Sequence, residues 1–284
     1  MAHPHHPRSR DSTRQSSVAR LVALAVLLCG DVSSATAQQR GGGDPGGPDG
    51  AGGPQDTQWG LGIGVLAKQD AYRGIKRETQ VVPLLRFENE YLEFGGLDLE
   101  VKLPGLQLGE SSRIKFGIVG EFELSGYKAK DAPVLSGMAE RKSGFWAGAK
   151  AEWEYDFVKV SAEWTADVSG HSKGRKFGLG LEAEWHLGEH AMLAPYVTAY
   201  RLDRKYVDYY YGVRAAEATV GRAAYVGKGG VNLDIGLRTV YQFDEHHSML
   251  LDLSITRLAR QIKASPLVGR SSTSQVILGY MYSF

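Results

Sequence analysis

Apolar and polar residues alternate with a period of two over much of residues 57–284. The C-terminal stretch SQVILGYMYSF has aliphatic or aromatic residues at every second position: Val276, Leu278, Tyr280, Tyr282 and Phe284. Successive side chains of a β-strand point to opposite faces, so these residues form one continuous apolar face. The residues between them are mixed in polarity, which is typical of a strand with lipid on one side and a tolerant interior on the other.

Eleven segments with this alternation follow one another, at residues 57–68, 81–88, 91–103, 114–124, 145–155, 158–168, 177–185, 193–202, 231–243, 249–258 and 274–284. Most are about ten residues long, which is the length that a tilted strand needs to cross a bilayer. In the first segment, the glycines of residues 60–64 alternate with apolar residues and are expected on the crowded inner face. Trp153, Trp164 and Trp185 lie near segment ends, where an interfacial aromatic girdle would place them.

The pattern predicts an all-β protein, namely an antiparallel transmembrane β-barrel of the outer membrane. A β-sandwich also alternates, but an export signal and the aromatic C-terminus favour the barrel. Bacterial barrels of one chain have an even number of strands, so eleven segments mean that one is missed or one is false. Twelve strands are favoured, with the missing strand expected within residues 203–225, and ten strands are the alternative.

Residues 1–37 predict a secretory signal peptide. Four arginines precede the apolar run LVALAVLLC, and Ala35 and Ala37 supply the small residues of a cleavage site. The only cysteine, Cys29, lies in the part that cleavage would remove, so no disulfide is expected in the mature chain. Residues 38–56 are rich in glycine, proline and aspartate and are expected to form a flexible periplasmic tether. The barrel domain then occupies residues 57–284.

The charge balance excludes one class of function. The chain has 33 Lys and Arg against 32 Asp and Glu, so no basic surface indicates a nucleic-acid partner. Charged residues that alternate with apolar ones are expected to face the lumen, in particular Lys150, Glu152, Glu182, Glu184 and Arg238. A barrel of ten to twelve strands lies between barrels filled by side chains and wide porins, so an open and a plugged lumen are both compatible with the sequence.

A cluster of tyrosines is the strongest candidate for contact with a ligand or a partner. It comprises Tyr206, Tyr209, Tyr210 and Tyr211. Tyrosine rings provide flat, amphipathic contact surface. The alternative interpretation is a set of girdle residues together with a loop that folds over the barrel mouth.

No residue pattern predicts catalysis, a metal site or a cofactor. His171 and Ser172 are adjacent, and adjacent side chains on an extended chain point apart, so a polar turn is favoured over a nucleophile with its base. Histidines also occur at other predicted turns, including His246 and His247, but nothing in the sequence brings them together as metal ligands. No enzyme is expected.

Five short motifs resemble the MltA-interacting protein family, also called MipA/OmpV. They occur in the order of that family: Tyr72-Arg-Gly74, Ser136-Gly-Met138 with Arg141, YYYGVRAAEA at residues 209–218, Ser265-Pro-Leu-Val268, and the Tyr-x-Phe end. The likeness extends from about Trp59 to Phe284, which is essentially the whole predicted mature domain.

The resemblance implies an outer-membrane barrel of a Gram-negative bacterium, in contact with outer-membrane lipid. It further implies a non-enzymatic scaffold that brings a lytic transglycosylase and a peptidoglycan synthase together in the cell envelope. A narrow channel for small polar solutes and a surface adhesin are the alternatives. For such barrels as a class, Tyr280, Tyr282 and Phe284 are expected to form the signal for the barrel-assembly machinery.

Overall fold

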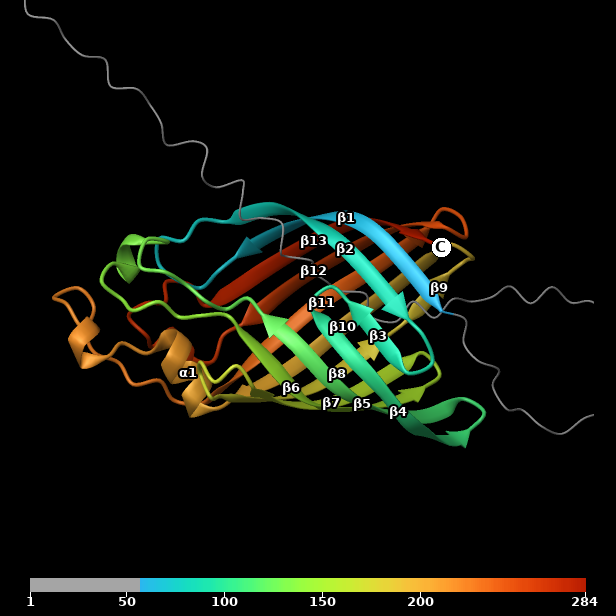
Figure 1. Ribbon diagram of the computed structural model, residues 1–284, viewed down its shortest axis with the longest axis horizontal. Coiled ribbons are helices and arrows are strands. Elements are labelled where there is room, and N and C mark those ends of the chain that lie inside the picture. Colours follow the sequence, from blue (N-terminus) through green and yellow to red (C-terminus); the bar gives the residue numbers. More distant parts are fainter. Residues whose placement is uncertain (1–56) are drawn as a thin grey trace, which may run out of the picture.

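The chain folds into a closed, antiparallel β-barrel with a cap of loops and short helices at one end (Figure 1). The computed structural model describes residues 57–284, so the predicted signal peptide and tether lie outside the described residues. The strands are β1 (Gln58–Gln69), β2 (Glu78–Glu88), β3 (Leu92–Gly95), β4 (Asp98–Gly109), β5 (Ser112–Glu123), β6 (Gly144–Tyr155), β7 (Val158–Asp167), β8 (Arg175–Ala183), β9 (Trp185–Leu187), β10 (Ala191–Leu202), β11 (Gly230–Gln242), β12 (His247–Arg257) and β13 (Ser272–Ser283).

The barrel has twelve wall positions, as favoured from the sequence. β8 and β9 both pair with β10 and form one interrupted strand. The first and last strands close the ring, because β1 pairs with β13 from Gly60↔Ser283 to Gln69↔Ser274. Closure satisfies the backbone groups of these two strands, which lipid could not do.

The twelfth strand is not where the sequence pattern suggested. Residues 203–225, the expected location, contain helix α1 (Arg204–Tyr211) and the 3₁₀ helix η2 (Ala215–Glu217), so that expectation was wrong. The missing strand is β3, because the single segment predicted at 91–103 contains a tight hairpin. Gly96 has a φ of 66° at its turn, a conformation that glycine adopts without steric cost.

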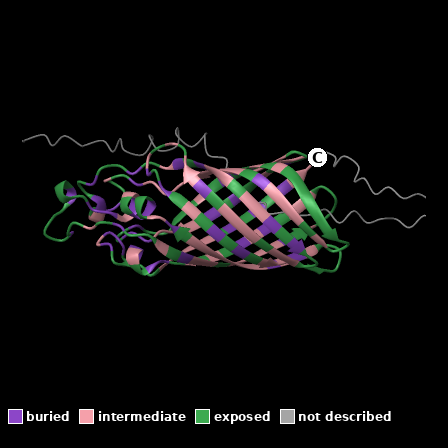
Figure 2. Cartoon of the chain, turned by 90° about the horizontal axis from the view of Figure 1, so that it is seen from below, coloured by how far each residue is buried: buried purple, intermediate pink, exposed green. Residues whose placement is uncertain are grey.

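The two faces of the wall follow the predicted alternation (Figure 2). On β1, Trp59, Leu61 and Ile63 are 56%, 49% and 57% exposed on the outside, whereas Gly60 and Gly64 are buried. At Gly62, a Cβ atom would lie 2.2 Å from the carbonyl oxygen of Tyr280, so a side chain would not fit there without movement of the backbone. The prediction of inward-facing glycines is therefore confirmed.

The two ends of the barrel differ in the length of their connections. Short turns at 89–91, 110–111, 156–157, 188–190 and 243–246 lie at the end where β1 begins and β13 finishes. The opposite end carries longer loops with α1, η1 (Pro133–Leu135), η2 and α2 (Arg260–Lys263), which we call the cap. Among residues 57–284, no helix is long and apolar enough to cross a membrane.

Candidate functional site

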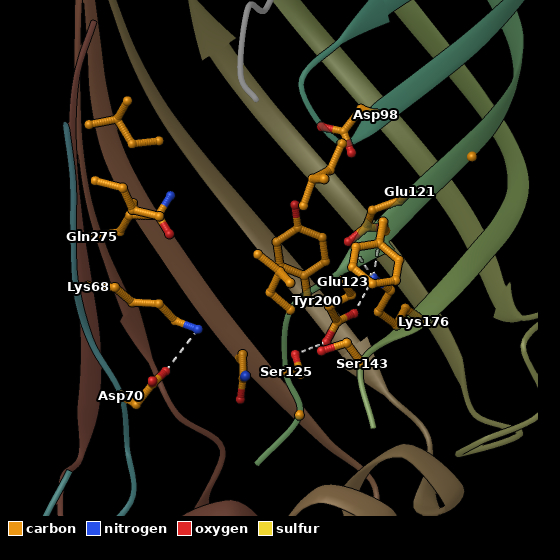
Figure 3. Close-up of a pocket in the computed structure, with 18 of the residues that line it drawn as sticks. Lys68, Asp70, Asp98, Glu121, Glu123, Ser125, Ser143, Lys176, Tyr200 and Gln275 are labelled. Atoms are coloured by element: carbon orange, nitrogen blue, oxygen red, sulfur yellow. Dashed lines mark hydrogen bonds and ion pairs between the residues drawn. The ribbon is translucent and has the colours of Figure 1, made fainter. Parts of the chain in front are cut away.

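A cavity of about 860 Å³ occupies the lumen below the cap (Figure 3). Lys176 on β8 lines this cavity and reaches across to β5. The Lys176 Nζ lies 2.8 Å from carboxylate oxygens of both Glu121 and Glu123. Lys176 also lies over the ring of Trp146, 4.6 Å from its centroid, so four strand-borne side chains form one interior cluster.

All five charged residues expected in the lumen lie on the inner face, each in an ion pair. Lys150 Nζ is 3.1 Å from Glu152, and Arg238 is 3.4 Å from Glu182. Glu184 accepts from Lys159 at 2.7 Å. Arg238 and Lys150 line the large cavity.

Other lumen residues were not singled out from the sequence. Lys176, Glu121 and Glu123 are in this group, as are Asp252, which is 1% exposed and 3.3 Å from Arg238, and Asp98. The signal that could have found them is the same alternation, since each lies next to an outward apolar residue, as Lys176 lies next to Phe177. The sequence does not say which of these strands face each other across the lumen, so no ion pair between them could be predicted.

An apolar cluster lies between the large cavity and a smaller one of about 190 Å³ at the end with the short turns. We call this cluster the septum; it consists of Leu66, Val82, Leu84, Ile277 and Met281, all at most 7% exposed. Leu66 and Ile277 line the large cavity, whereas Leu84 and Met281 line the small one. The septum thus lies at the boundary of the two cavities.

The four tyrosines proposed as a contact surface are built into the cap through α1. Asp203 caps this helix, accepting from the Tyr206 backbone N–H at 2.8 Å. Tyr206 and Tyr210 are only 7% and 1% exposed, and the Tyr206 hydroxyl donates to Glu123 in the lumen. Tyr211 stacks on Tyr72 with ring centroids 5.6 Å apart. Most of this aromatic surface is therefore used within the molecule, as in the interpretation of a loop folded over the barrel mouth.

A buried ion pair between Arg141 and Glu217 also holds the cap together. Arg141 donates to both carboxylate oxygens of Glu217, with an Nη2–Oε2 distance of 2.9 Å, and the two residues are 2% and 7% exposed. Burial by itself would raise the pKa of Glu217, but hydrogen bonds from Arg141 and from the backbone N–H groups of Arg214 and Ala139 lower this pKa to about 2. Arg141 also donates to the Tyr209 carbonyl at 2.7 Å.

Four of the five motifs that carry the family resemblance meet in this cap. The Tyr72 hydroxyl donates to the Tyr210 carbonyl, and the Ser265 hydroxyl donates to the Tyr211 carbonyl. The Arg141–Glu217 pair joins the motif of residues 209–218 to one further motif, that of Ser136-Gly-Met138 with Arg141. Segments from four separate loops are thus held together by hydrogen bonds. The sequence of one segment does not predict these bonds.

The C-terminal residues lie on the outer surface at the end with the short turns. Tyr280 and Phe284 are 42% and 67% exposed, and Tyr282 contacts the Phe284 ring edge-on at 5.0 Å. The Phe284 backbone N–H donates to the Trp59 carbonyl at 2.9 Å. Their role as an assembly signal stays a prediction.

The polar segment that contains His171 and Ser172 is a loop between β7 and β8. Asp167 organises it by accepting from the backbone and hydroxyl of Ser172 at 2.6 and 2.8 Å. His171 Nδ1 lies 2.9 Å from the Ser143 carbonyl oxygen and 3.2 Å from the Ser169 hydroxyl. Within residues 57–284, no three His, Cys, Asp or Glu side chains are grouped closely enough to hold a metal ion.

Comparison with known proteins finds relatives that are named as outer membrane proteins or as an MltA-interacting protein. The chain is 26% identical over 233 residues to outer membrane protein OmpV of Vibrio cholerae, covering 79% of this chain and 85% of the relative. It is 23% identical over 225 residues to the putative outer membrane protein YiaT of Escherichia coli K12, covering 79% and 90%. It is also 23% identical over 237 residues to the MltA-interacting protein of E. coli K12, covering 81% and 91%.

Among solved structures, the chain has a similarity to the COG4313 outer membrane channel from Pseudomonas putida F1. Its TM-score is 0.43 at 12% identity, covering 80% of this chain and 95% of that one. The family model described as MltA-interacting protein MipA matches residues 61–284. Together with the closed barrel and the outer-membrane relatives, this match means that the chain belongs to the MltA-interacting protein family and is a β-barrel of the Gram-negative outer membrane.

Proposed function

We propose that this protein is a non-enzymatic outer-membrane scaffold that recruits a lytic transglycosylase, and with it a peptidoglycan synthase, to the inner side of the membrane. The observation that carries the proposal is that the lumen is filled along its axis at two levels. The cap lies over one end, and the septum lies between the two cavities below it. A barrel filled in this way is suited to presenting a surface more than to conducting solutes.

The packing of the cap supports a lasting closure. Its two buried clusters include Val207, Ile262, Leu135 and Leu267, all 0% exposed, and they are contributed by four different loops or helices. Burying such side chains contributes roughly 1.5–3 kcal/mol each. Opening the mouth would expose them together, so the cap is expected to stay in place.

The end with the short turns is the periplasmic one, because bacterial barrels place both termini and their short turns there. The β4–β5 hairpin extends at this end (Figure 1). Residues 103–109 of β4 pair with β5 alone, and Leu106 and Leu108 are 54% and 60% exposed. A strand edge with exposed leucines fits partner binding by strand addition.

One relative, which is 23% identical to this chain, is named MltA-interacting protein. This name supports a lytic transglycosylase as the partner. We assign the docking surface to the β4–β5 hairpin and give the predicted tether, residues 38–56, an auxiliary role. The tether lies outside the described residues.

A pull-down with the lytic transglycosylase of the same cell envelope tests the proposal. The double variant Leu106→Ser, Leu108→Ser should reduce capture roughly tenfold, because two apolar contacts are lost. Val220→Ser, at a fully exposed position in the cap, is the control and should bind like the wild type. Equal capture by all three proteins would remove the hairpin from the proposal, and absence of capture by the wild type would overturn the scaffold role.

The second candidate is a narrow channel, which the charge-lined cavity favours. Single-channel conductance of the refolded barrel in a planar bilayer separates the two candidates. We expect no discrete current steps from a protein that still shows heat-modifiable gel migration. Regular steps would make conduction the primary function.

A further inference from the structure

The strand pairing of the barrel wall is interrupted on one side, between β2 and the tip of the β3–β4 hairpin. The ladder between β2 and β3 covers only Arg86↔Gly95 to Glu88↔Glu93, with one further bond from the Gly96 N–H to the Leu85 carbonyl at 3.2 Å. Residues 78–84 of β2 continue towards the cap with β1 as their only paired neighbour in the described chain. The hairpin is too short to accompany β2 to its end.

The sequence of β2 is adapted to an unpaired edge. Alternate residues of a strand direct their backbone groups to the same side, so Val81 and Pro83 face the same edge as Leu85. Pro83 has no backbone N–H. Any other residue at this position would place an N–H donor without a partner at this edge. Proline inside a sheet is typical of edges. Backbone groups without partners are costly in lipid, so this edge needs water or a polar molecule beside it.

The large cavity borders the wall at this place. Its lining includes inward residues such as Asp98, Glu121 and Lys176, and also outward residues such as Leu97, Leu99 and Phe122. Leu99 is 39% exposed on the outer surface. Phe122 contacts the outward Phe145, with ring centroids 4.6 Å apart. A lining drawn from both faces of the same strands indicates an opening between β2 and the hairpin.

We propose that this opening is a lateral portal, through which a single-chain amphiphile in the outer leaflet places its head group in the lumen while its alkyl chain stays at the apolar rim, with cationic head groups preferred. The portal goes beyond the scaffold role and does not depend on it. It leads sideways from the lumen into the membrane and leaves the septum and the cap closed.

The preference for a cation follows from the charges that line the cavity. Nine carboxylate residues stand against four basic ones: Asp70, Glu78, Glu93, Asp98, Glu100, Glu121, Glu123, Asp131 and Glu163 against Lys68, Lys150, Lys176 and Arg238. Lys176 is already engaged by Glu121 and Glu123. Among residues 57–284, the carboxylates of Asp98 and Glu163 make no ion pair or hydrogen bond of their own, and Asp98 directly follows the portal residue Leu97. Asp98 points into the cavity in Figure 3.

The first experiment asks whether the wall is open in a bilayer. A nitroxide is attached to Leu97→Cys at the portal and, as a control, to Ile63→Cys in a part of the wall that is paired on both sides. Both variants carry Cys29→Ser, which removes the only native cysteine. The portal label should collide with a water-soluble nickel chelate several-fold more often than the control label, while both collide with oxygen. Equal, lipid-like accessibility at the two sites would overturn the portal.

The second experiment measures binding of defined probes. A bimane fluorophore on Gln80→Cys reports on the portal interior of the barrel in phosphatidylcholine nanodiscs. Dodecyltrimethylammonium should saturate the response at a concentration roughly tenfold lower than tetramethylammonium, and dodecyl sulfate should give no saturable response. Equal responses to both dodecyl compounds would overturn the cation preference. Absence of any saturable response would overturn the binding site.

Charge variants test the assigned carboxylate. Asp98→Asn should raise the half-saturating concentration of dodecyltrimethylammonium roughly threefold to tenfold. Glu110→Gln, in an exposed turn at the opposite end of the barrel, is the matched control and should leave this concentration unchanged. Unchanged binding in Asp98→Asn would remove Asp98 from the site. None of these readouts involves the transglycosylase, so failure of the portal and failure of the scaffold role are distinguishable.

Discussion

The lumen of this barrel is filled in two different ways on one continuous strand ladder. On β13, β1 and β2 the inner face is apolar and carries the septum, packed beside glycines such as Gly60 and Gly64. On β5–β8, β11 and β12 the inner face is charged, with Lys176, Arg238 and their carboxylate partners. We call these the apolar wall and the charged wall.

This difference explains how the barrel closes its axis at one level and keeps a cavity at another. Apolar side chains fill space without needing specific partners, so the apolar wall packs tightly. A buried charge needs a partner at a suitable distance, and some carboxylates on the charged wall have none. The charged wall therefore borders the large cavity, and the apolar wall forms the septum below it.

The largest expected effect comes from breaking an ion pair of the charged wall. Arg238→Ala leaves Asp252, which is 1% exposed, without its cation. The free energy of unfolding should fall by about 3 kcal/mol, because an uncompensated charge remains buried. Urea unfolding of the barrel in detergent micelles measures this loss.

The double variant Arg238→Met, Asp252→Leu is the control for that prediction. It converts this part of the charged wall into an apolar one and should regain most of the lost stability. If the single variant were as stable as the wild type, the ion pair would not be a structural requirement of the wall.

Shortening side chains of the apolar wall is expected to cause a smaller loss of stability and, in the double variant, to allow conduction. Leu84→Ala should lower the free energy of unfolding by about 2 kcal/mol, through lost burial and the cavity left behind. Leu84→Ala together with Met281→Ala should connect the two cavities and produce discrete current steps in a planar bilayer. A silent double variant that remains folded would mean that other side chains block the axis.

A local, pH-dependent effect is expected in the cap, which uses one buried ion pair within an apolar cluster. The pKa of Glu217 is lowered to about 2, against an unfolded value of about 4.3. Its stabilisation is therefore complete above about pH 5 and is lost as the pH falls from about 4 towards 2. Limited proteolysis of the cap loops should become faster over that range.

Glu217→Gln provides the comparison for the pH experiment. This variant should be cleaved faster at neutral pH and should lose the acid-dependent part of the change. If acid accelerated cleavage equally in both proteins, a group other than Glu217 would control the cap.

Several features could be predicted from residues alone. Alternation identified which residues of each strand face outwards, as for Trp59 and Ile63, and which charges face the lumen, as for Lys150 and Arg238. A signal for β3 was also present but was missed. Gly95 and Gly96 interrupt the alternation, because the outward residues change from even positions, as in Phe94, to odd positions, as in Leu99.

The all-β class, the inner and outer faces and the family follow from the residues alone, because each depends on local periodicity or on short motifs. The three-dimensional structure was needed to show that Arg141 meets Glu217, that the tyrosines of α1 pack inside the cap, and that the β2 edge is unpaired above Leu85. Periodicity specifies the face on which a side chain lies but not the strand beside it. Partners far apart in sequence meet only when the ring closes, and the length of one hairpin then determines whether the wall is complete.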